Sequence, residues 1–503
     1  MEPFNFESIV DLGLIDFDFD SLPEDLIIES YSVESRLADI NTHKSPGPDG
    51  IPNWFLRDFS VWLAEPICCI FNTSVRTGIF PQVWKQANVV PVPKVQPPGN
   101  IESDLRPISL TPTLSKILES YVGNWMMNRV LPKLDQKQFG ALKGRSTTHA
   151  LVDMLHMWHQ ALDQSLSARV LFVDFSKAFD RVDHTSVMNN LIELGIPGSV
   201  LKWFASFLAN RQQRVKIGNC LSSWLTLNGS MPQGSWLGPF SFIVLINSLK
   251  LSCPTHKYVD DTTLTELLSR NQPSCMDTYL NELRQWSMAN HMLINEQKTK
   301  EMIITFSHSV SIPQLLNIER VNVFKLLGIY ISSDMKWNSH VTYVCKKANS
   351  RLHFLRQLKR AAVSCEDMLQ FYISIIRPVI EYAAPAWHTS LTVELADSIE
   401  SLQKRALRII FGGDSFTHSS YESFCETLAI STLQTRRDEL AINFFEKILN
   451  PSDCLNYLIP EKRDSSQLEK LRNHTVYCPP FARTQRFKNS FIVYSLSNYV
   501  CGS

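Results

Sequence analysis

The sequence predicts an α+β protein, and three observations lead to this fold class. In residues 146–163 the apolar side chains recur at helix spacing behind Ser146, a typical N-cap residue. Residues 170–175 form a nearly continuous apolar run, as in a buried strand. From about residue 338 the pattern becomes mostly helical. The chain has 503 residues, 44% of them hydrophobic and 19% charged, so it can bury substantial cores.

The other elements follow in chain order from the same periodicities. Residues 1–39 hold eleven acidic residues and one basic residue, and we expect this leader to be poorly structured or peripheral. The prolines within residues 88–93 indicate an edge strand. Further predicted elements are helices at 52–85, from 184, at 241–249 and at 276–291, a hairpin around Gly218-Asn219, two strands meeting at a turn in 256–264, and a strand at 302–306.

Net charge and cysteine usage exclude some classes of protein. The 49 basic and 49 acidic residues cancel, so the net charge gives no sign of a nucleic-acid partner. The eleven cysteines include no CxxC spacing, which indicates reduced thiols and no zinc site. No signal-peptide pattern is visible, and the longest apolar stretch is too short to cross a bilayer. We therefore expect an intracellular protein without a membrane partner.

Three carboxylates are candidates for metal-dependent chemistry. Asp174 lies within the apolar strand, and Asp260 and Asp261 are adjacent in the predicted turn. A lone acid in a buried strand is unfavourable unless it is paired or metal-bound, and neighbouring carboxylates repel each other. Mg²⁺ relieves this repulsion and prefers a few carboxylates plus substrate phosphates as ligands. Considered singly, an Asp doublet is typical of a solvated turn.

Three other features have both a functional and a structural interpretation. The segment 232–239 holds two glycines and two prolines, which suits a loop that approaches a ligand or a purely structural loop. Lys94 and Arg106 flank a loop and could hold a triphosphate, or could be ordinary surface charges. Phe179, five residues after Asp174, could be a core residue or a wall against a bound sugar.

The order of these motifs resembles the reverse transcriptases of non-LTR (LINE-type, jockey-like) retrotransposons. The motifs that carry the resemblance are Lys44-Ser-Pro-Gly-Pro-Asp-Gly50, Arg106-Pro-Ile-Ser-Leu110, Gln138-Phe-Gly140, Phe172-Val-Asp-Phe-Ser-Lys-Ala-Phe-Asp180, Pro232-Gln-Gly234, Tyr258-Val-Asp-Asp261, Asn295-Glu-Gln-Lys-Thr299 and Phe324-Lys-Leu-Leu-Gly328. The second and third resemble the finger motifs of the family, and the last resembles its primer grip. The resemblance implies a right-hand polymerase fold with fingers, a palm with an antiparallel sheet, a helical thumb and a mostly helical C-terminal region.

The resemblance also implies an activity: an RNA-directed DNA polymerase that adds deoxynucleotides to a DNA 3′-hydroxyl on an RNA template. Two Mg²⁺ ions, with Mn²⁺ as an alternative, would be bound by the catalytic residues Asp174, Asp260 and Asp261. The nucleotide-binding residues would be Lys94, Arg106, Phe179, Gln233, Gly234 and Lys298. Phe179 would select against a 2′-hydroxyl, and Asp180 is expected to cap the next helix. The primer grip would be Leu327 and Gly328.

Basic residues between 346 and 360 would then contact the nucleic-acid backbone. These fifteen residues hold six basic residues and no acid: Lys346, Lys347, Arg351, Arg356, Lys359 and Arg360. In the family this position is the thumb, which follows the template–primer duplex; a solvated helix face is the alternative. The implied organisation is an acidic leader (1–43), fingers and palm with the primer grip (44–331), a thumb-like region (332–415) and a C-terminal region without an assigned role (416–503).

The sequence departs from the family pattern at Trp236, Val259 and Leu326, and none of these positions supplies a catalytic atom. Such elements usually encode an endonuclease before the polymerase, and residues 1–43 are too short for one. We therefore expect that the chain is the polymerase region of a larger reading frame. A separately encoded endonuclease is a possible partner that the resemblance implies. Its site of action would be nuclear. The rival interpretations are a catalytically idle nucleic-acid-binding remnant and, third, a group II intron maturase.

Overall fold

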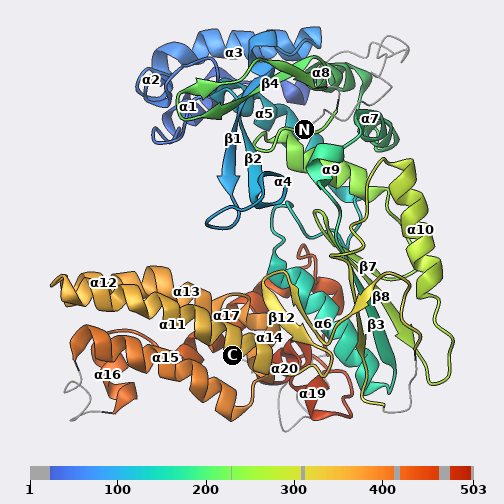
Figure 1. Ribbon diagram of the computed structural model, residues 1–503, viewed down its shortest axis with the longest axis vertical. Helices are drawn as coiled ribbons and strands as arrows, with labels where there is room; N and C mark the ends of the chain where they lie inside the picture. Colours follow the sequence, from blue (N-terminus) through green and yellow to red (C-terminus); the bar gives the residue numbers. More distant parts are fainter. Residues whose placement is uncertain (1–22, 228, 308–311, 413–419, 464–475, 500–503) are drawn as a thin grey trace.

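The computed structural model describes residues 23–227, 229–307, 312–412, 420–463 and 476–499, and their helices and strands form two lobes joined along one side (Figure 1). The upper lobe corresponds to the fingers. Its elements are α1 (Ser30–Ala38), α2 (Asn53–Asp58), α3 (Ser60–Thr77), β1 (Gln86–Pro93), α4 (Ile101–Asp104), β2 (Leu105–Leu110), α5 (Thr113–Val130), α7 (His184–Glu193), α8 (Gly198–Leu208), β4 (Arg211–Ile217), β5 (Cys220–Leu221), β6 (Leu225–Leu227) and α9 (Leu237–Asn247).

The lower lobe holds the palm and a layer of helices beside it (Figure 1). The palm elements are α6 (Thr147–Asp163), β3 (Ser167–Val173), β7 (Thr255–Tyr258), β8 (Asp261–Leu268), α10 (Met276–Ala289), β9 (Lys300–Ile304), β10 (Glu319–Arg320), β11 (Val323–Leu326) and β12 (Ile329–Ser332). The helices beyond it are α11 (Asn338–Arg360), α12 (Cys365–Phe371), α13 (Arg377–Glu381), α14 (Ala384–Trp387), α15 (Val393–Phe411), α16 (Tyr421–Thr427), α17 (Leu433–Ile448), α19 (Gln485–Lys488) and α20 (Phe491–Asn498).

The palm sheet has the strand order β10-β9-β3-β8-β7, and β3 pairs antiparallel with both of its neighbours. Every residue of β3 is buried, as the apolar run predicts. Alternate side chains of the strand enter different cores: Leu171 and Val173 face the core shared with the fingers, whereas Val170 and Phe172 face the core shared with the thumb-like helices. The central palm strand therefore links both lobes and fixes the position of the residue that follows it.

The antiparallel hairpin of β7 and β8, the buried helix α9 and the helices α6, α10 and α11 confirm the predicted elements. The predicted edge strand is wrong, because β1 lies between β2 and β4. Pairing with β4 covers only residues 86–89, so Pro91 and Pro93 lie beyond it, where no amide donor is required on that side.

The acidic leader is not peripheral where the structure describes it. Val33 and Leu37 of α1 are fully buried against α3, and Leu26 is also in the core of the fingers. The side-chain amide of Asn72 on α3 donates to the carbonyl of Ile28 at 2.8 Å and its oxygen accepts from the Ile28 amide at 2.9 Å. The expectation is therefore wrong for residues 23–39, because their apolar side chains pack into the core of the fingers despite the acidic composition. Residues 1–22 lie outside the described residues.

The C-terminal region folds back onto the palm. Helices α19 and α20 pack against α6, and the carboxylate of Asp163 at the end of α6 accepts from the amides of Arg483 (3.0 Å) and Thr484 (2.6 Å). Phe445 of α17 and Leu496 of α20 belong to the same core as Trp158 of α6. These helices thus support the palm rather than form a separate unit.

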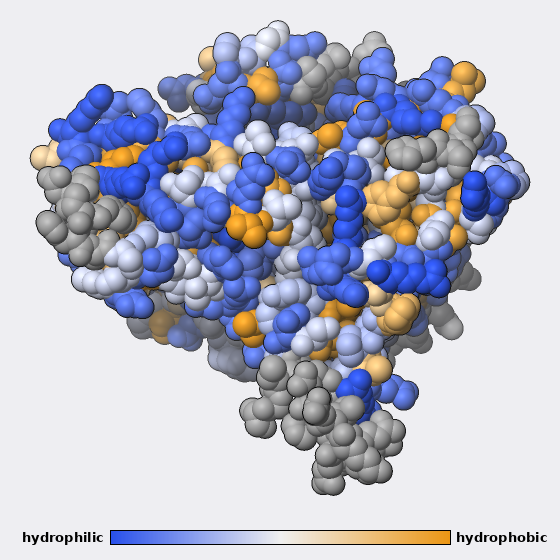
Figure 2. Space-filling model, turned by 90° about the horizontal axis from the view of Figure 1, so that it is seen from below, coloured by the Kyte–Doolittle hydropathy of each residue, from blue (hydrophilic) through white to orange (hydrophobic). Residues whose placement is uncertain are grey.

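The face formed by the lower helices is mostly hydrophilic, with small separated hydrophobic areas (Figure 2). Such scattered apolar residues are normal for a protein surface. Within the described part of the chain, no helix combines the length and apolar composition needed to cross a bilayer.

Candidate active site

The three carboxylates meet at one edge of the palm sheet. Val173 of β3 pairs with Thr262 of β8, so Asp174, which follows β3, lies beside Asp261, which begins β8. Asp260 is in the two-residue turn between Tyr258 and Asp261, which pair with each other. Residues that are 86 and 87 positions apart in the sequence are therefore brought together by the register of two neighbouring strands.

The turn that carries Asp260 has an unusual backbone conformation. Val259 has φ 59°, a left-handed conformation that is unfavourable for a β-branched residue. The side-chain oxygen of Gln138 accepts from the amides of Val259 (3.3 Å) and Gly140 (3.0 Å). A Cβ atom at Gly140 would lie 2.5 Å from the Val259 nitrogen, so only glycine fits there. The Gln138-Phe-Gly140 motif thus supports the candidate catalytic turn of the palm. The resemblance of this motif to a finger motif does not indicate such a contact with the palm.

The pKa values of all three acids are raised, with burial as the largest cause. Burial, then Asp260 and then Asp174 raise the pKa of Asp261 to about 6. Burial raises the pKa of Asp260, and the charge of Asp174 adds to this effect. Burial also raises the pKa of Asp174, opposed by Lys298, whose Nζ lies 4.0 Å from Asp174 Oδ2.

A divalent cation fits this donor set, because it would compensate carboxylates that burial and repulsion otherwise drive towards protonation. The three carboxylates lie at one sheet edge, close enough for their charges to affect one another, but their oxygen atoms do not form a tight cluster. Among the described residues, the group with three ligand atoms within 4.8 Å of one another is His149, Asp453 and Cys454 instead. A shared ion would favour a closer approach of the palm oxygens.

Lys94 and Arg106 lie together on the β1–β2 hairpin. Val92 pairs with Arg106, and the Lys94 amide donates to the Asp104 carbonyl at 2.7 Å. By strand alternation Lys94 and Arg106 therefore project from the same face, and both are exposed. The hairpin extends from the upper lobe towards the lower one (Figure 1).

Gln233 forms a hydrogen bond with Asp180, whose carboxylate is close enough to Lys94 to be affected by its charge. Its Nε2 donates to Asp180 Oδ1 at 3.2 Å. Burial raises the pKa of Asp180, opposed by this hydrogen bond and by the charges of Lys177 and Lys94. The expectation that Asp180 caps the next helix is wrong: the carboxylate of Asp183 is the cap, accepting from the Ser186 amide at 2.8 Å.

The loop that carries Gln233 and Gly234 packs directly on β2. The Ser109 amide donates to the Gln233 carbonyl at 2.8 Å. Gly234 has φ 134°, and a Cβ atom there would lie 2.5 Å from the Ser109 oxygen. This close approach requires glycine, as the structural interpretation of the loop predicts.

Glu119 is a residue that sequence reasoning missed. Its fully buried carboxylate accepts from the amides of Trp236 (2.9 Å) and Leu237 (3.4 Å), where the 232–239 loop enters α9. Gly123, one turn further along α5, makes room for Trp236, because a Cβ atom there would lie 2.1 Å from the indole ring. A lone acid in the predominantly apolar segment 114–126 is the signal that could have identified it.

Phe179 is half-buried, and its ring centroid lies 5.2 Å from that of Phe242. The contact with Phe242 confirms the interpretation of Phe179 as a core residue, and its role as a wall against a bound sugar stays a prediction.

Leu327 and Gly328 form the two-residue turn between β11 and β12, with φ 44° and 91°. The Tyr382 hydroxyl donates to the Leu327 carbonyl at 2.9 Å. Leu327 also lines a small pocket together with Tyr258 and Asp261, so this turn lies next to the carboxylates. The sequence-predicted primer grip and catalytic turn are therefore neighbours.

The six basic residues of α11 do not act as one surface. Lys359 donates from Nζ to the Ile410 carbonyl at 2.7 Å, and Arg351 donates to the Ile375 carbonyl. Lys347 lies 5.7 Å from the centroid of the Tyr343 ring, near the Gly328 turn. Lys346, Arg356 and Arg360 are exposed. Two of the six thus bind neighbouring helices, and four remain on the exposed surface of the helix.

Comparisons with known proteins identify the family of this chain. The sequence pattern of the reverse transcriptase (RNA-dependent DNA polymerase) family matches residues 92–343, half of the chain, and the chain belongs to this family. Enzymes of this family use divalent metal ions. A shorter match, to the N-terminal part of alkylated DNA repair protein alkB homolog 8, covers residues 337–377.

The similar curated proteins come from retrotransposable elements. The RNA-directed DNA polymerase from mobile element jockey of Drosophila melanogaster is 26% identical over 441 residues, which are 83% of this chain and 47% of that protein. The probable RNA-directed DNA polymerase from transposon BS of the same organism is 26% identical over 393 residues, 73% of this chain and 43% of that protein. The chain thus spans somewhat less than half the length of these relatives.

A solved structure of telomerase from Candida albicans in complex with a fragment of telomeric RNA covers 80% of this chain and 79% of its own, with 12% sequence identity and a TM-score of 0.40.

Proposed function

We propose that this chain is the RNA-directed DNA polymerase part of a non-LTR retrotransposon protein. It adds deoxynucleotides to a DNA 3′-hydroxyl on an RNA template. The observation that carries the proposal is the convergence of Asp174, Asp260 and Asp261 at one sheet edge, with raised pKa values and a turn supported by Gln138. Family membership supports it. The intact trio favours the polymerase over a catalytically idle remnant.

Asp174, Asp260 and Asp261 would hold two Mg²⁺ ions, with Mn²⁺ as a substitute. Bound ions of this kind activate the attacking hydroxyl and stabilise the leaving pyrophosphate. The role of the three carboxylates is to supply hard oxygen ligands from a rigid edge, with their mutual repulsion favouring a bound cation. Lys298, whose Nζ lies 4.0 Å from Asp174 Oδ2, would protonate the leaving pyrophosphate or position the loop.

The incoming deoxynucleotide would lie between the fingers and the carboxylates. Lys94 and Arg106 project from one face of their hairpin and would bind its triphosphate. The accessible part of Phe179 would exclude a ribose 2′-hydroxyl. Gln233, held by Asp180, and Gly234 would contact the nucleotide and the template.

The RNA template and DNA primer would be held from the lower lobe. Leu327 and Gly328 form the proposed primer grip, fixed by Tyr382. The exposed basic residues of α11 that bind no neighbouring helix, Lys346, Lys347, Arg356 and Arg360, would contact the duplex backbone. We place the fingers and palm in residues 44–331 and the thumb in 332–415, with the fingers extended by α1. Action in the nucleus and cooperation with a separately encoded endonuclease complete the proposal.

Primer extension tests this function. The purified chain is incubated with an RNA template, an annealed DNA primer, Mg²⁺ and either deoxynucleotides or ribonucleotides. We expect extension with deoxynucleotides only, and Phe179→Ala should admit ribonucleotides. If the wild-type chain binds the duplex in a gel shift but does not extend the primer under any of these conditions, the idle remnant is the better account.

A further inference from the structure

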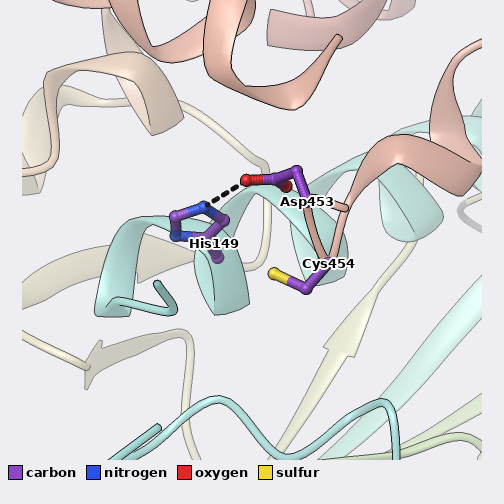
Figure 3. Close-up of side chains that lie close together, drawn as sticks. All are labelled: His149, Asp453 and Cys454. Atoms are coloured by element: carbon purple, nitrogen blue, oxygen red, sulfur yellow. Dashed lines mark hydrogen bonds and ion pairs between the residues drawn. The ribbon is translucent and has the colours of Figure 1, made fainter. Parts of the chain in front are cut away.

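Three side chains outside the candidate active site converge where the C-terminal region meets the palm (Figure 3). His149 lies in the first turn of α6, and Asp453 and Cys454 follow α17. One ligand atom of each, an imidazole nitrogen, a carboxylate oxygen and the thiol sulfur, lies within 4.8 Å of the other two. His149 and Asp453 are 304 positions apart in the sequence, so no spacing motif could indicate this cluster.

Other contacts orient the imidazole and the carboxylate. The Ser146 hydroxyl lies 2.8 Å from His149 Nδ1, and the Phe444 ring packs edge-on against the imidazole at 4.7 Å. Asp453 Oδ1 accepts from the Leu455 amide at 2.8 Å. These contacts leave His149 Nε2 and Asp453 Oδ2 facing each other. Metal ligands in proteins are typically fixed in this way by a second hydrogen bond.

The gap between the two facing atoms is consistent with a shared cation. His149 Nε2 and Asp453 Oδ2 are 3.4 Å apart, which is long for an N–H···O hydrogen bond. When the imidazole proton is on Nδ1, both facing atoms are acceptors, and a cation between them removes the repulsion. The side chains of His149 and Asp453 are only 8% and 12% exposed, so bulk water screens them little.

We propose that His149, Asp453 and Cys454 bind one Zn²⁺ ion. The combination of imidazole nitrogen, carboxylate oxygen and thiolate sulfur suits zinc, whereas Mg²⁺ and Ca²⁺ prefer oxygen ligands alone. Asp453 and Cys454 also line a cavity of about 800 Å³, which leaves room for water as the fourth ligand. The site is therefore separate in position and in ligand chemistry from the three palm carboxylates.

The charges around the cluster are compatible with a bound ion. A carboxylate and a thiolate together neutralise Zn²⁺. Arg145 and Lys447 are cations in the cavity wall, and Glu446 is a further acid there. Arg145 Nη1 donates to the carbonyls of Gln136 and Gln138. Lys143 lines the cavity as well and is exposed.

A bound ion would fasten the C-terminal region to α6. The Thr147 hydroxyl beside it lies 3.0 Å from the hydroxyl of Tyr382, the residue that also holds the Gly328 turn. The proposed ion therefore stabilises the junction of palm, thumb-like helices and C-terminal region, and does not take part in nucleotide chemistry.

Cobalt substitution tests the site directly. The full chain is freed of metal with a chelator, supplied with excess Mg²⁺ to occupy the palm carboxylates, and titrated with Co²⁺. We expect one equivalent to bind with a thiolate-to-cobalt charge-transfer absorption in the near ultraviolet. Cys454→Ser should remove this absorption, and His149→Ala should weaken binding at least about tenfold. Zn²⁺ should displace the Co²⁺ and raise the unfolding temperature of the wild type.

Two matched variants separate this site from others. Cys220→Ser removes an exposed thiol on β5, and Asp174→Asn removes a palm carboxylate; both should keep the absorption. If the wild-type chain shows no charge-transfer absorption, or if Cys454→Ser keeps it, the proposed site is wrong. Because absorption and stability are measured without nucleic acid, failure of the polymerase proposal would not affect this result.

Discussion

One short strand, β7, connects two groups of acids that behave in opposite ways. At His256 it meets Asp153 of α6, a carboxylate that also binds Lys137 at 2.6 Å and the Tyr457 hydroxyl. Burial alone would raise the pKa of Asp153, yet His256 and Lys137 hold it at about 2. Two residues beyond β7 lies Asp260, in the group whose pKa values are raised.

The difference separates a structural acid from a functional one. Asp153 is 3% exposed and is compensated by cations and donors of the chain itself. Of the palm trio, Asp174 has Lys298 at 4.0 Å, and Asp260 and Asp261 have each other and Asp174 as their principal charged neighbours. An acid that the fold compensates stabilises the fold, whereas acids that the fold assembles without compensation are suited to bind an external cation.

The largest effect is expected from removing the uncompensated charges. The double variant Asp260→Asn, Asp261→Asn should lower primer extension by at least about a thousandfold, because metal-ion catalysis is worth several kcal/mol. Single-nucleotide incorporation rates measure this loss. The same variant should unfold at a higher temperature than the wild type in chelator, since it lacks the repulsion. Activity within tenfold of the wild type would contradict the assignment of the trio.

Removing the compensated charge should affect stability instead. Asp153→Asn should destabilise the fold by about 3 kcal/mol, because it leaves the buried His256 and the partly exposed Lys137 without their charged partner. Denaturant unfolding at neutral pH measures this change, with the exposed Asp39→Asn as the control. A variant as stable as the control, or one that is fully folded but inactive, would remove the distinction between the two groups.

A third acid, Glu119, extends the comparison to the fingers, because its buried carboxylate is compensated by the charge of Arg211 and by hydrogen bonds from backbone amides. Glu119→Ala should destabilise the fold by about 2 kcal/mol and raise the KM for deoxynucleotides more than it lowers kcat, since the 232–239 loop loses its anchor. Glu193→Ala, on the exposed face of α7, is the control. Equal KM values in the two variants would show that the loop does not depend on Glu119.

The two groups should respond to pH with opposite signs. The pKa of Asp153 is lowered, so its stabilisation is present above the unfolded value near 3.8 and is lost as the pH falls towards 2. The pKa of Asp261 is raised to about 6, so without metal its contribution is fully present below 3.8 and is lost as the pH rises through 6. Unfolding between pH 4.5 and pH 7.5 in chelator should show a decline in stability in the wild type that is smaller in Asp261→Asn, because the raised pKa values of Asp174 and Asp260 still contribute. Identical pH profiles would contradict the raised pKa.

The sequence allowed those parts of the fold and of the active site that lie in contiguous motifs to be predicted. Asp174 and the Tyr258–Asp261 turn are identifiable because a strand end and a two-residue turn are short-range structures with short-range sequence signals. Arg106 and Lys94 could be named, but their common face depends on the β1–β2 register. The resemblance to a known family, rather than periodicity, supplied the role of each.

Contacts between distant segments could not be predicted. Nothing in the local sequence indicates that Tyr457 contacts Asp153 or that Gln138 supports Val259. The acidic composition of the leader likewise gives no sign that α1 packs into the core of the fingers. The proposed zinc site has the same origin, because its ligands come from α6 and from the segment after α17. Tertiary packing decides these positions, and a single sequence carries little signal for it.

The most direct test follows stability and activity together in one Mg²⁺ titration. Wild type, the Asp260→Asn, Asp261→Asn variant and Asp153→Asn are titrated at neutral pH, with unfolding temperature and primer extension measured on the same samples. We predict that Mg²⁺ stabilises the wild type and starts extension over the same concentration range, that Asp153→Asn responds likewise from a lower baseline, and that the double variant does neither. Extension without Mg²⁺-dependent stabilisation, or stabilisation of the double variant equal to the wild type, would contradict the claim that these carboxylates hold the catalytic metal.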